Sequence, residues 1–202
     1  MKTVWLDPQA AEEQAKLVRQ ELLMKPWPDT YQRFMECMEV INPHFVDSLL
    51  DVGCGAGHYG RICQRAWPTL RYHGTDLSPF MVAVARVEAP DLSFAVADFF
   101  DNDFAASDVV LVSSTLEYTA DPLRALAHAL RETPGYLILH RLHLTADTEP
   151  THVVNEPTYC GRREDKLHWN RRDVLERIKA NDRQVMHTCF WGQLMSVVVN
   201  AR

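Results

Sequence analysis

Residues 48–58 read Ser-Leu-Leu-Asp-Val-Gly-Cys-Gly-Ala-Gly-His, and this stretch decides the fold of the 202-residue chain. Its first five residues predict a short buried strand, and a helical pattern begins at about Tyr59. Between them lie three glycines, Gly53, Gly55 and Gly57, which allow bare backbone to come close to a ligand. A helix that starts directly after such a turn adds unpaired N–H groups and a partial positive charge. The stretch therefore predicts a parallel α/β fold with a site for an adenosine-containing cofactor.

The glycine spacing distinguishes two classes of nucleotide-binding turn. The dinucleotide fingerprint G-x-G-x-x-G would place its third glycine at position 58, where this chain has His58. The chain instead reads D-x-G-x-G-x-G from Asp51 to Gly57, which resembles motif I of the class I S-adenosylmethionine (SAM)-dependent methyltransferases. The resemblance implies that Asp51, Gly53, Gly55 and Gly57 belong to a SAM site. A glycine-rich turn without a ligand is the alternative that this loop alone leaves open.

An acidic residue stands at the end of the second predicted strand, residues 69–75. Asp76 at this tip can accept hydrogen bonds from both hydroxyl groups of a cofactor ribose. The alternative is that Asp76 caps the next helix, but Ser78 before Pro79 is the better cap and leaves Asp76 free. Leu77 would then lie against one face of the adenine.

Two further segments complete the predicted cofactor site. Asp98 and Phe99 follow the third strand, residues 92–96, and resemble the family's motif at that place. The resemblance implies that Asp98 receives the adenine amino group and that Phe99 packs on the ring; capping of a local turn is the alternative for Asp98. Ser113 ends the fourth strand, residues 107–113, and is assigned to the same site. This strand is an apolar run suited to the centre of a parallel sheet.

Polar residues beyond the fourth and fifth strands are the candidates for catalysis, because open α/β sheets bind ligands at the carboxyl ends of their strands. Glu117 and Tyr118 follow the fourth strand in a segment that resembles the L-E-H-x-x-D-P motif of small-molecule methyltransferases, with Tyr118 in place of the histidine. His140 and His143 lie at or past the end of the fifth strand, residues 136–140. Histidine titrates near neutral pH, so either could remove a proton from a hydroxyl or ammonium acceptor. The alternative is that these polar residues have no catalytic role and are simply exposed to solvent at the strand tips.

Two residues are candidates for holding the methyl acceptor. Arg141, just past the fifth strand, could bind a carboxylate or phosphate group bidentately. Tyr31 lies on one face of the second of two predicted N-terminal helices, which cover residues 8–24 and about 29–41. In the resembled family such helices often form a lid over the substrate. An ordinary core contact is the alternative for Tyr31.

The C-terminal part is predicted to complete the sheet. Residues 142–168 are polar and irregular, and a loop of this length is often a functional lid; Tyr159 within it is a weaker candidate for lining the site. A helix follows over residues 171–180. Strands over residues 184–190 and 194–200, joined by a short turn, form a hairpin and give an antiparallel edge. Such an edge is expected of the methyltransferase fold rather than of an ordinary NAD-binding domain.

These elements together predict one α/β domain with a doubly wound, mostly parallel seven-stranded sheet and an antiparallel C-terminal hairpin edge. Residues 1–44 would form an N-terminal helical lid over the cofactor end of the sheet. Residues 45–141 would form the SAM-binding core, and residues 142–202 the loop and the substrate-side elements.

Composition limits the partners and the compartment. The net charge of −6 argues against a nucleic-acid-binding protein that relies on bulk positive charge. Five cysteines, an odd number without a C-x-x-C pair, suggest neither a disulfide framework nor a zinc site, and free thiols fit the cytoplasm. The sequence shows no signal peptide and no run long enough to span a membrane. We therefore expect a cytoplasmic protein with a small-molecule partner rather than nucleic acid or membrane, and a homodimer as its assembly.

The sequence predicts a SAM-dependent methyltransferase that methylates an oxygen or nitrogen atom of a small-molecule acceptor and releases S-adenosylhomocysteine (SAH). No metal ion is required, because the sulfonium of SAM already activates the methyl group. Two alternatives stay open. One is an NAD-dependent oxidoreductase or epimerase, and the other is a non-catalytic, SAM-binding partner subunit.

Overall fold

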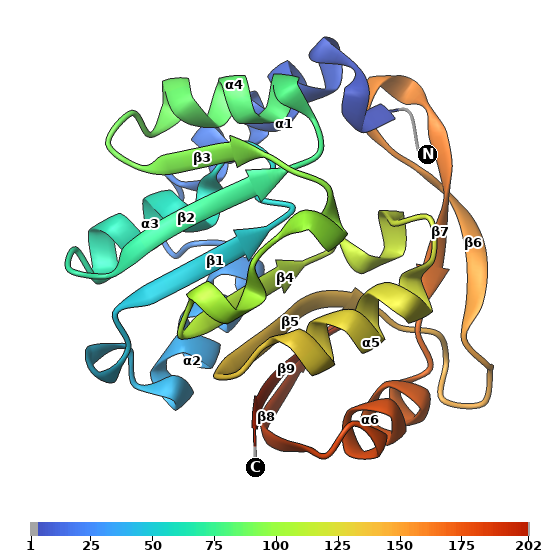
Figure 1. Ribbon diagram of the computed structural model, residues 1–202. Helices are drawn as coiled ribbons and strands as arrows, with labels where there is room; N and C mark the ends of the chain where they lie inside the picture. The colour runs from blue at the N-terminus through green and yellow to red at the C-terminus, as the bar shows by residue number, and fades with distance from the viewer. Residues whose placement is uncertain (1–3, 202) are drawn as a thin grey trace.

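The computed structural model describes residues 4–201, in which seven strands form one sheet flanked by helices (Figure 1). The strands of this sheet are β1 (Ser48–Val52), β2 (Arg71–Asp76), β3 (Ser93–Val96), β4 (Val109–Ser113), β5 (Tyr136–His143), β8 (Arg183–Trp191) and β9 (Leu194–Ala201). The α-helices are α1 (Pro8–Glu21), α2 (Asp29–Ile41), α3 (His58–Ala66), α4 (Pro79–Glu88), α5 (Pro122–Glu132) and α6 (Arg171–Ala180). β1 and α6 begin and end at the residues that the sequence predicted.

The strand order β3-β2-β1-β4-β5-β9-β8 places β1 between β2 and β4. Neighbouring strands among β1–β5 are parallel, whereas β9 is antiparallel to both β5 and β8. The predicted mostly parallel sheet with a C-terminal hairpin is therefore confirmed. The strand order reverses between β1 and β4, and open α/β sheets bind ligands beyond the carboxyl ends of the strands at such a point. The glycine turn that follows β1 lies there.

Helices cover both faces of the sheet; in the view of Figure 1, α5 lies in front of it and α2 behind. Successive residues of a strand face opposite sides. Leu49 accordingly packs in a core cluster with residues of α1–α4, and Leu50 packs in a second cluster with residues of α5 and α6. Burial on both faces explains the continuous apolar run of β4.

The structure corrects the interpretation of residues 142–168 as an irregular loop. β5 continues to His143, and β6 (His152–Pro157) and β7 (Arg163–His168) form a separate antiparallel pair. The hairpin is largely polar, so the alternation of apolar and polar residues that predicts a strand is missing from its sequence. Polar contacts between the strands hold it instead: Nδ2 of Asn155 donates to Oδ1 of Asp165 over 2.8 Å. In Figure 1 the hairpin stands at the end of the sheet toward which the parallel strands point.

The starts of α2 and α4 differ in how they are capped. As predicted, the Ser78 hydroxyl accepts a hydrogen bond from the N–H of Met81 at the start of α4, over 3.3 Å. α2 begins at Asp29 directly after Pro28, and no side chain caps it. Asp29 and Thr30 are residue types that often cap helices, but both already lie inside the first turn of α2.

Candidate active site

A cavity of about 910 Å³ lies beyond the carboxyl ends of the parallel strands. Residues that follow the strands form its floor, and the predicted site residues among them are Gly53, Gly55, Asp76, Leu77, Asp98, Phe99, Ser113, Tyr118, Arg141 and His143. Its roof comes from η1 (Val4–Leu6), from α1 and from η6 (Tyr159–Gly161) at the tip of the β6–β7 hairpin. Segments far apart in the chain thus enclose one space at the strand-order reversal.

Gly53 and Gly55 occupy places where a side chain would not fit. Their φ angles are +80° and +51°, in the left-handed region that favours glycine. A Cβ atom at Gly53 would lie 2.3 Å from Oγ1 of Thr115, and one at Gly55 would lie 2.4 Å from Oε1 of Gln14. The same Gln14 oxygen accepts a hydrogen bond from the backbone N–H of Ala56 over 2.7 Å. The turn therefore presents its backbone to the cavity and is held in place by α1.

Asp76 joins the glycine turn to the tip of β2. Its Oδ2 accepts a hydrogen bond from the N–H of Gly55 and its Oδ1 accepts one from the N–H of Ser78, each over 2.9 Å. Each carboxylate oxygen can accept a further hydrogen bond, so Asp76 keeps acceptor capacity toward the cavity that it lines. Burial raises the pKa of Asp76, while the two backbone donors oppose that shift. The neighbouring Leu77 is 42% exposed and offers an apolar surface at the same wall.

Asp98 and Phe99 form the next wall of the cavity. Asp98 accepts a hydrogen bond from the N–H of Phe100 over 3.0 Å and so caps η3 (Phe99–Asp101). This capping, the alternative that the sequence left open, is compatible with a contact to a ligand because a carboxylate accepts several hydrogen bonds. Phe99 packs in the core cluster beneath β1 and β4 and presents its ring to the cavity.

Arg141 enters the cavity because β5 is bulged. The pairing of β5 with β9 shifts register between Leu139 and Leu142, and Arg141 has a φ of +57°, unusual for a residue with a side chain. A bulge re-aims the side chain of the extra residue. The Arg141 guanidinium hydrogen-bonds to Tyr59, while its buried Nε has no hydrogen-bond partner among residues 4–201. A cationic donor is thus directed into the space above the glycine turn.

Lys166 of β7 adds a second cation to the cavity. Its Nζ lies 2.6 Å from Nε2 of His143 and 5.2 Å from the ring centroid of Tyr118. Burial and the Lys166 charge lower the pKa of His143 to about 3. His58, which also lines the cavity, has its pKa lowered to about 3 by burial and by Arg141. Both imidazoles are therefore neutral at pH 7 and weakly basic.

The same motifs are found in known proteins. Residues 50–132 match a family model described as a methyltransferase domain. This segment, which carries the turn from Gly53 to Gly57, Asp76 and Asp98, is therefore similar to a methyltransferase domain. A trans-aconitate 2-methyltransferase from a strain of Escherichia coli is 32% identical over 112 residues, which cover 54% of this chain and 44% of that protein. The chain thus spans less than half the length of this curated relative.

Solved methyltransferases share the fold of the whole described chain. The SAM-bound CalS10, an amino pentose methyltransferase from Micromonospora echinaspora, superposes with a TM-score of 0.68 at 15% identity and covers 95% of this chain and 96% of its own. The sugar N-methyltransferase KedS8 from a Streptoalloteichus species has a TM-score of 0.61 at 20% identity, with coverage of 97% and 88%. At these identities the likeness concerns the fold alone.

Two residues of the D-x-G-x-G-x-G motif support the glycine turn from outside the cavity. Asp51 is fully buried in β1, where its Oδ2 accepts a hydrogen bond from the Tyr72 hydroxyl over 2.6 Å. Burial raises the pKa of Asp51 to about 7. Gly57 precedes α3 with a φ of +75°, and a Cβ atom there would lie 2.9 Å from the Phe94 ring. Neither residue lines the cavity, and both lie beneath the turn that does.

The structure corrects the predicted places of His140 and Tyr31. His140 is not at a strand tip, because β9 pairs with β5 as far as His143; it is fully buried, and its Nδ1 is hydrogen-bonded to the Ser196 hydroxyl. Tyr31 is buried in the core cluster, where its hydroxyl donates to Oε2 of Glu21 over 2.6 Å. Neither side chain lines the cavity.

Glu117 is also outside the cavity. It is fully buried, and its Oε1 accepts a hydrogen bond from the backbone N–H of His143 over 3.4 Å. Burial raises the pKa of this carboxyl, and the Lys166 charge opposes the shift. Glu117 therefore positions the end of β5 rather than facing a ligand in the cavity.

Gln14, Thr115 and Lys166 are among the lining residues that sequence reasoning missed. Thr115 stands two residues before Glu117, so the motif after β4 offered a signal for it. Gln14 and Lys166 come from polar segments whose local pattern carries no sign of a ligand. Their roles follow from the packing of α1 and the β6–β7 hairpin over the sheet.

Proposed function

We propose that this chain transfers the methyl group of SAM to a carboxylate oxygen of a small acidic acceptor and releases SAH. One observation carries this proposal: the glycine turn, Asp76, Arg141 and Lys166 all line a single cavity. The turn and Asp76 offer backbone and acceptor groups suited to a nucleoside, and Arg141 and Lys166 are two cations beside them. The trans-aconitate named for the Escherichia coli relative is itself a carboxylate.

For the cofactor, we assign the cavity residues that end or follow the strands β1 to β4. Asp76 would accept the ribose hydroxyls, Leu77 and Phe99 would pack against the adenine, and Asp98 would accept from its amino group. Gly53, Gly55 and Ser113 would border the methionyl part. When bound, SAM supplies a methyl group on a positively charged sulfur that is already activated for transfer.

For the acceptor, we assign Arg141 and Lys166. The guanidinium of Arg141, which lines the cavity, is a donor of the kind that binds a carboxylate, and the Lys166 charge would hold a second anionic group. A carboxylate needs no base, because it is already ionised at neutral pH. This fits the two cavity histidines, His58 and His143, since an effective base has a pKa close to the working pH and theirs are near 3.

We further assign the exclusion of water to the roof of the cavity. The N–H of Cys160 donates to Oε2 of Glu13 over 2.8 Å, and the guanidinium of Arg162 pairs with Asp7 over 2.6 Å. These contacts join the β6–β7 hairpin to the N-terminal segment. The acceptor would enter when they open, so η1, α1 and the β6–β7 hairpin would act together as the lid.

The cofactor assignment is tested by calorimetric titration with SAH, run in parallel with NAD. SAH should bind the wild type, and NAD should not. Asp76→Ala should lose SAH binding, whereas Asp101→Ala, an exposed acid in the next loop, should keep it. Binding of NAD instead would support an oxidoreductase and overturn the proposal.

The acceptor assignment is tested by measuring SAH release with a panel of small mono-, di- and tricarboxylic acids and the matching amides. Turnover with acids and none with amides is expected. SAH binding without turnover of any acid or amide would favour the non-catalytic partner subunit. Turnover restricted to amines or neutral alcohols would overturn the carboxylate assignment.

Location and assembly are proposals too. Within residues 4–201 no helix has the length and apolar character to cross a bilayer. The cytoplasm is proposed because the five cysteines are free thiols. Sedimentation of the purified protein tests the proposed homodimer.

A further inference from the structure

Four potential metal ligands converge between α2 and β8, away from the cavity. Glu36 and Cys37 are consecutive on α2, and His187 and Cys189 alternate on β8. Nε2 of His187 lies 2.9 Å from Oε1 of Glu36, and the thiols of Cys37 and Cys189 are hydrogen-bonded to each other. The ligand atoms of Glu36, His187 and Cys189 all lie within 4.8 Å of one another.

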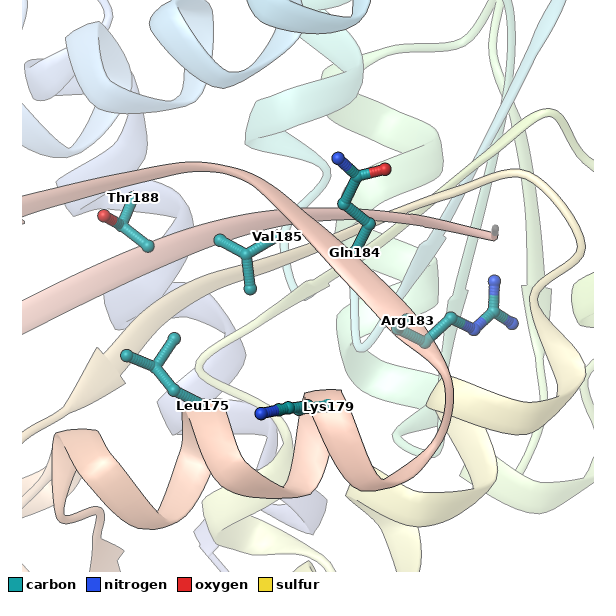
Figure 2. Close-up of a pocket in the computed structure, with 6 residues that line it drawn as sticks. All are labelled: Leu175, Lys179, Arg183, Gln184, Val185 and Thr188. Carbon is teal, nitrogen blue, oxygen red and sulfur yellow. The ribbon is translucent and has the colours of Figure 1, made fainter.

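The strand geometry explains why both β8 ligands face α2. Figure 2 shows Thr188 and Val185 of β8 on the side of α6, where they line a groove with Leu175. Side chains alternate along a strand, so His187 and Cys189 point to the opposite side. That side is covered by α2, in whose cluster Cys189 packs. The register shift between Val185 and His187 accounts for Val185 and Thr188 sharing a face.

We propose that Glu36, Cys37, His187 and Cys189 form a Zn²⁺ site that ties α2 to the edge strand β8. Two thiolates, one imidazole and one carboxylate are the donor types that Zn²⁺ takes in tetrahedral sites. Metal–ligand distances of about 2.0–2.3 Å place tetrahedral donors roughly 3.3–3.8 Å apart, within the span of Glu36, His187 and Cys189. Cys37, which contacts Cys189 but lies outside this group of three, would complete the tetrahedron. Binding releases the protons of both thiols, and His187 binds as the neutral imidazole with its proton on the other ring nitrogen.

The charges around the cluster suit a divalent cation. With both thiols ionised, the two sulfurs and the Glu36 carboxylate carry three negative charges, and Zn²⁺ leaves one of them unbalanced. Arg33 supplies the remaining positive charge, since its NH1 lies 2.6 Å from Oε2 of Glu36. This leaves Oε1 of Glu36 for the metal and orients the carboxylate from outside.

Two of the four ligands are buried and can hold an ion, and the other two are partly exposed and can let it enter. Cys37 is fully buried and Cys189 is 7% exposed, so the sulfurs lie under the surface. The side chains of Glu36 and His187 are 35% and 25% exposed. An ion can therefore arrive through the carboxylate and the imidazole and be held by the sulfurs.

A second cluster, formed by His143, Glu156 and His168, is less suited to a metal ion. The ammonium of Lys166 lies 2.6 Å from Nε2 of His143 and 3.9 Å from Oε2 of Glu156. This cation stands beside the ligand atoms and would repel a second one. In the cluster between α2 and β8, by contrast, Arg33 binds Oε2 of Glu36, which is not the oxygen proposed to bind the metal.

The test uses the full chain, reduced and freed of metal, titrated with Zn²⁺ and, for spectroscopy, with Co²⁺. One ion should bind per chain, and Co²⁺ should give thiolate-to-metal charge-transfer absorption and the visible bands of tetrahedral coordination. Cys37→Ser and Cys189→Ser should each weaken Zn²⁺ binding at least about tenfold and remove the charge-transfer bands or shift them to lower intensity. Cys63→Ser, which changes a buried cysteine outside the cluster, is the matched control and should bind as the wild type does.

Thermal unfolding gives an independent readout. Zn²⁺ should raise the Tm of the wild type and of Cys63→Ser, because it binds only the folded chain tightly, and should not raise that of Cys37→Ser. Circular dichroism of the metal-free variants checks that each is folded. The proposal is overturned if the reduced chain binds no Zn²⁺, if binding survives both substitutions, or if Cys63→Ser weakens it equally. Thiols that only form a Cys37–Cys189 disulfide in air, without binding either metal, would also overturn it.

Discussion

Asp76 and Gly55 are joined by a hydrogen bond of 2.9 Å from the backbone N–H of the glycine to the carboxylate of the acid. The tip of β2 and the turn after β1 therefore form one unit at the strand-order reversal. A change at Asp76 should affect the conformation of the turn as well as the contact proposed with the ribose.

Asp76→Asn should weaken SAH binding at least about tenfold, since hydrogen bonds to a charged group contribute about 1.5–3 kcal/mol each. Asp76→Ala should weaken it further, because the Gly55 N–H then loses its acceptor as well. Calorimetry measures both affinities. Equal affinities for the two variants would show that the Gly55 contact does not matter for binding.

Gly53→Ala should lower the free energy of unfolding by about 1–3 kcal/mol and weaken SAH binding, because the new Cβ overlaps the Thr115 side chain. Gly192→Ala is the matched control. Its φ is also positive, at +55°, but no atom lies within 4 Å of the added Cβ. Urea unfolding of both variants separates the backbone strain, present in each, from the overlap at Gly53. A Gly53→Ala variant as stable as Gly192→Ala would contradict the close approach of Thr115.

Arg141→Met should raise the KM for a carboxylate acceptor by about ten- to a hundredfold, because it removes a charged donor from the cavity. SAH affinity should change by less than about threefold, since the substitution leaves the residues assigned to the nucleoside unchanged. The KM of Arg141→Lys should be intermediate, because lysine keeps the positive charge but lacks the planar guanidinium. Steady-state kinetics measure all three. The exposed Arg131→Met is the control, and a fall in SAH affinity equal to the rise in KM would place Arg141 at the cofactor instead.

Asp51 should make the stability of the protein depend on pH. Its pKa is raised to about 7 in the folded chain from 3.8, so the folded state binds a proton that the unfolded state has released. Its contribution to stability is fully present below about pH 4 and is lost as the pH rises toward 7, at up to about 1.4 kcal/mol per pH unit. Asp51→Asn should remove this slope while keeping an acceptor for the Tyr72 hydroxyl.

Urea unfolding of wild type and Asp51→Asn between pH 5 and pH 8, about the folded pKa, measures the difference between the two curves. Other titrating groups affect both proteins equally, so their contribution drops out of the difference between wild type and Asp51→Asn. Parallel curves would mean that the Asp51 carboxyl is ionised in the folded chain throughout this range.

Glu13→Ala should loosen the roof of the cavity, because the N–H of Cys160 loses its acceptor. Hydrogen exchange over residues 152–168 should become faster, while Tm changes by only a few degrees, since the contact lies at the surface. Glu12→Ala, an exposed neighbour on α1, should leave exchange unchanged. Unchanged exchange in Glu13→Ala would show that other contacts hold the hairpin.

Local sequence determined the cofactor half of this protein. The strand over residues 48–52, the glycines after it and the acids at 76 and 98 each lie within one strand–turn–helix unit. Hydrophobic runs locate such strands, and parallel strands bring their carboxyl ends to one edge of the sheet. The spacing of these residues along the chain therefore sufficed to predict that Gly53, Asp76 and Asp98 would line one site.

Tertiary packing decided the rest. β9 pairs with β5 beyond the predicted strand end, and β5 has a bulge there. For this reason His140 lies outside the cavity and Arg141 lines it. Lys166 reached the site through a polar hairpin with no strand-like pattern. Cys37 and Cys189 met because α2 packs on an edge strand from the far end of the chain. Contacts between distant segments depend on the packing of whole elements, and no local period in the sequence encodes them.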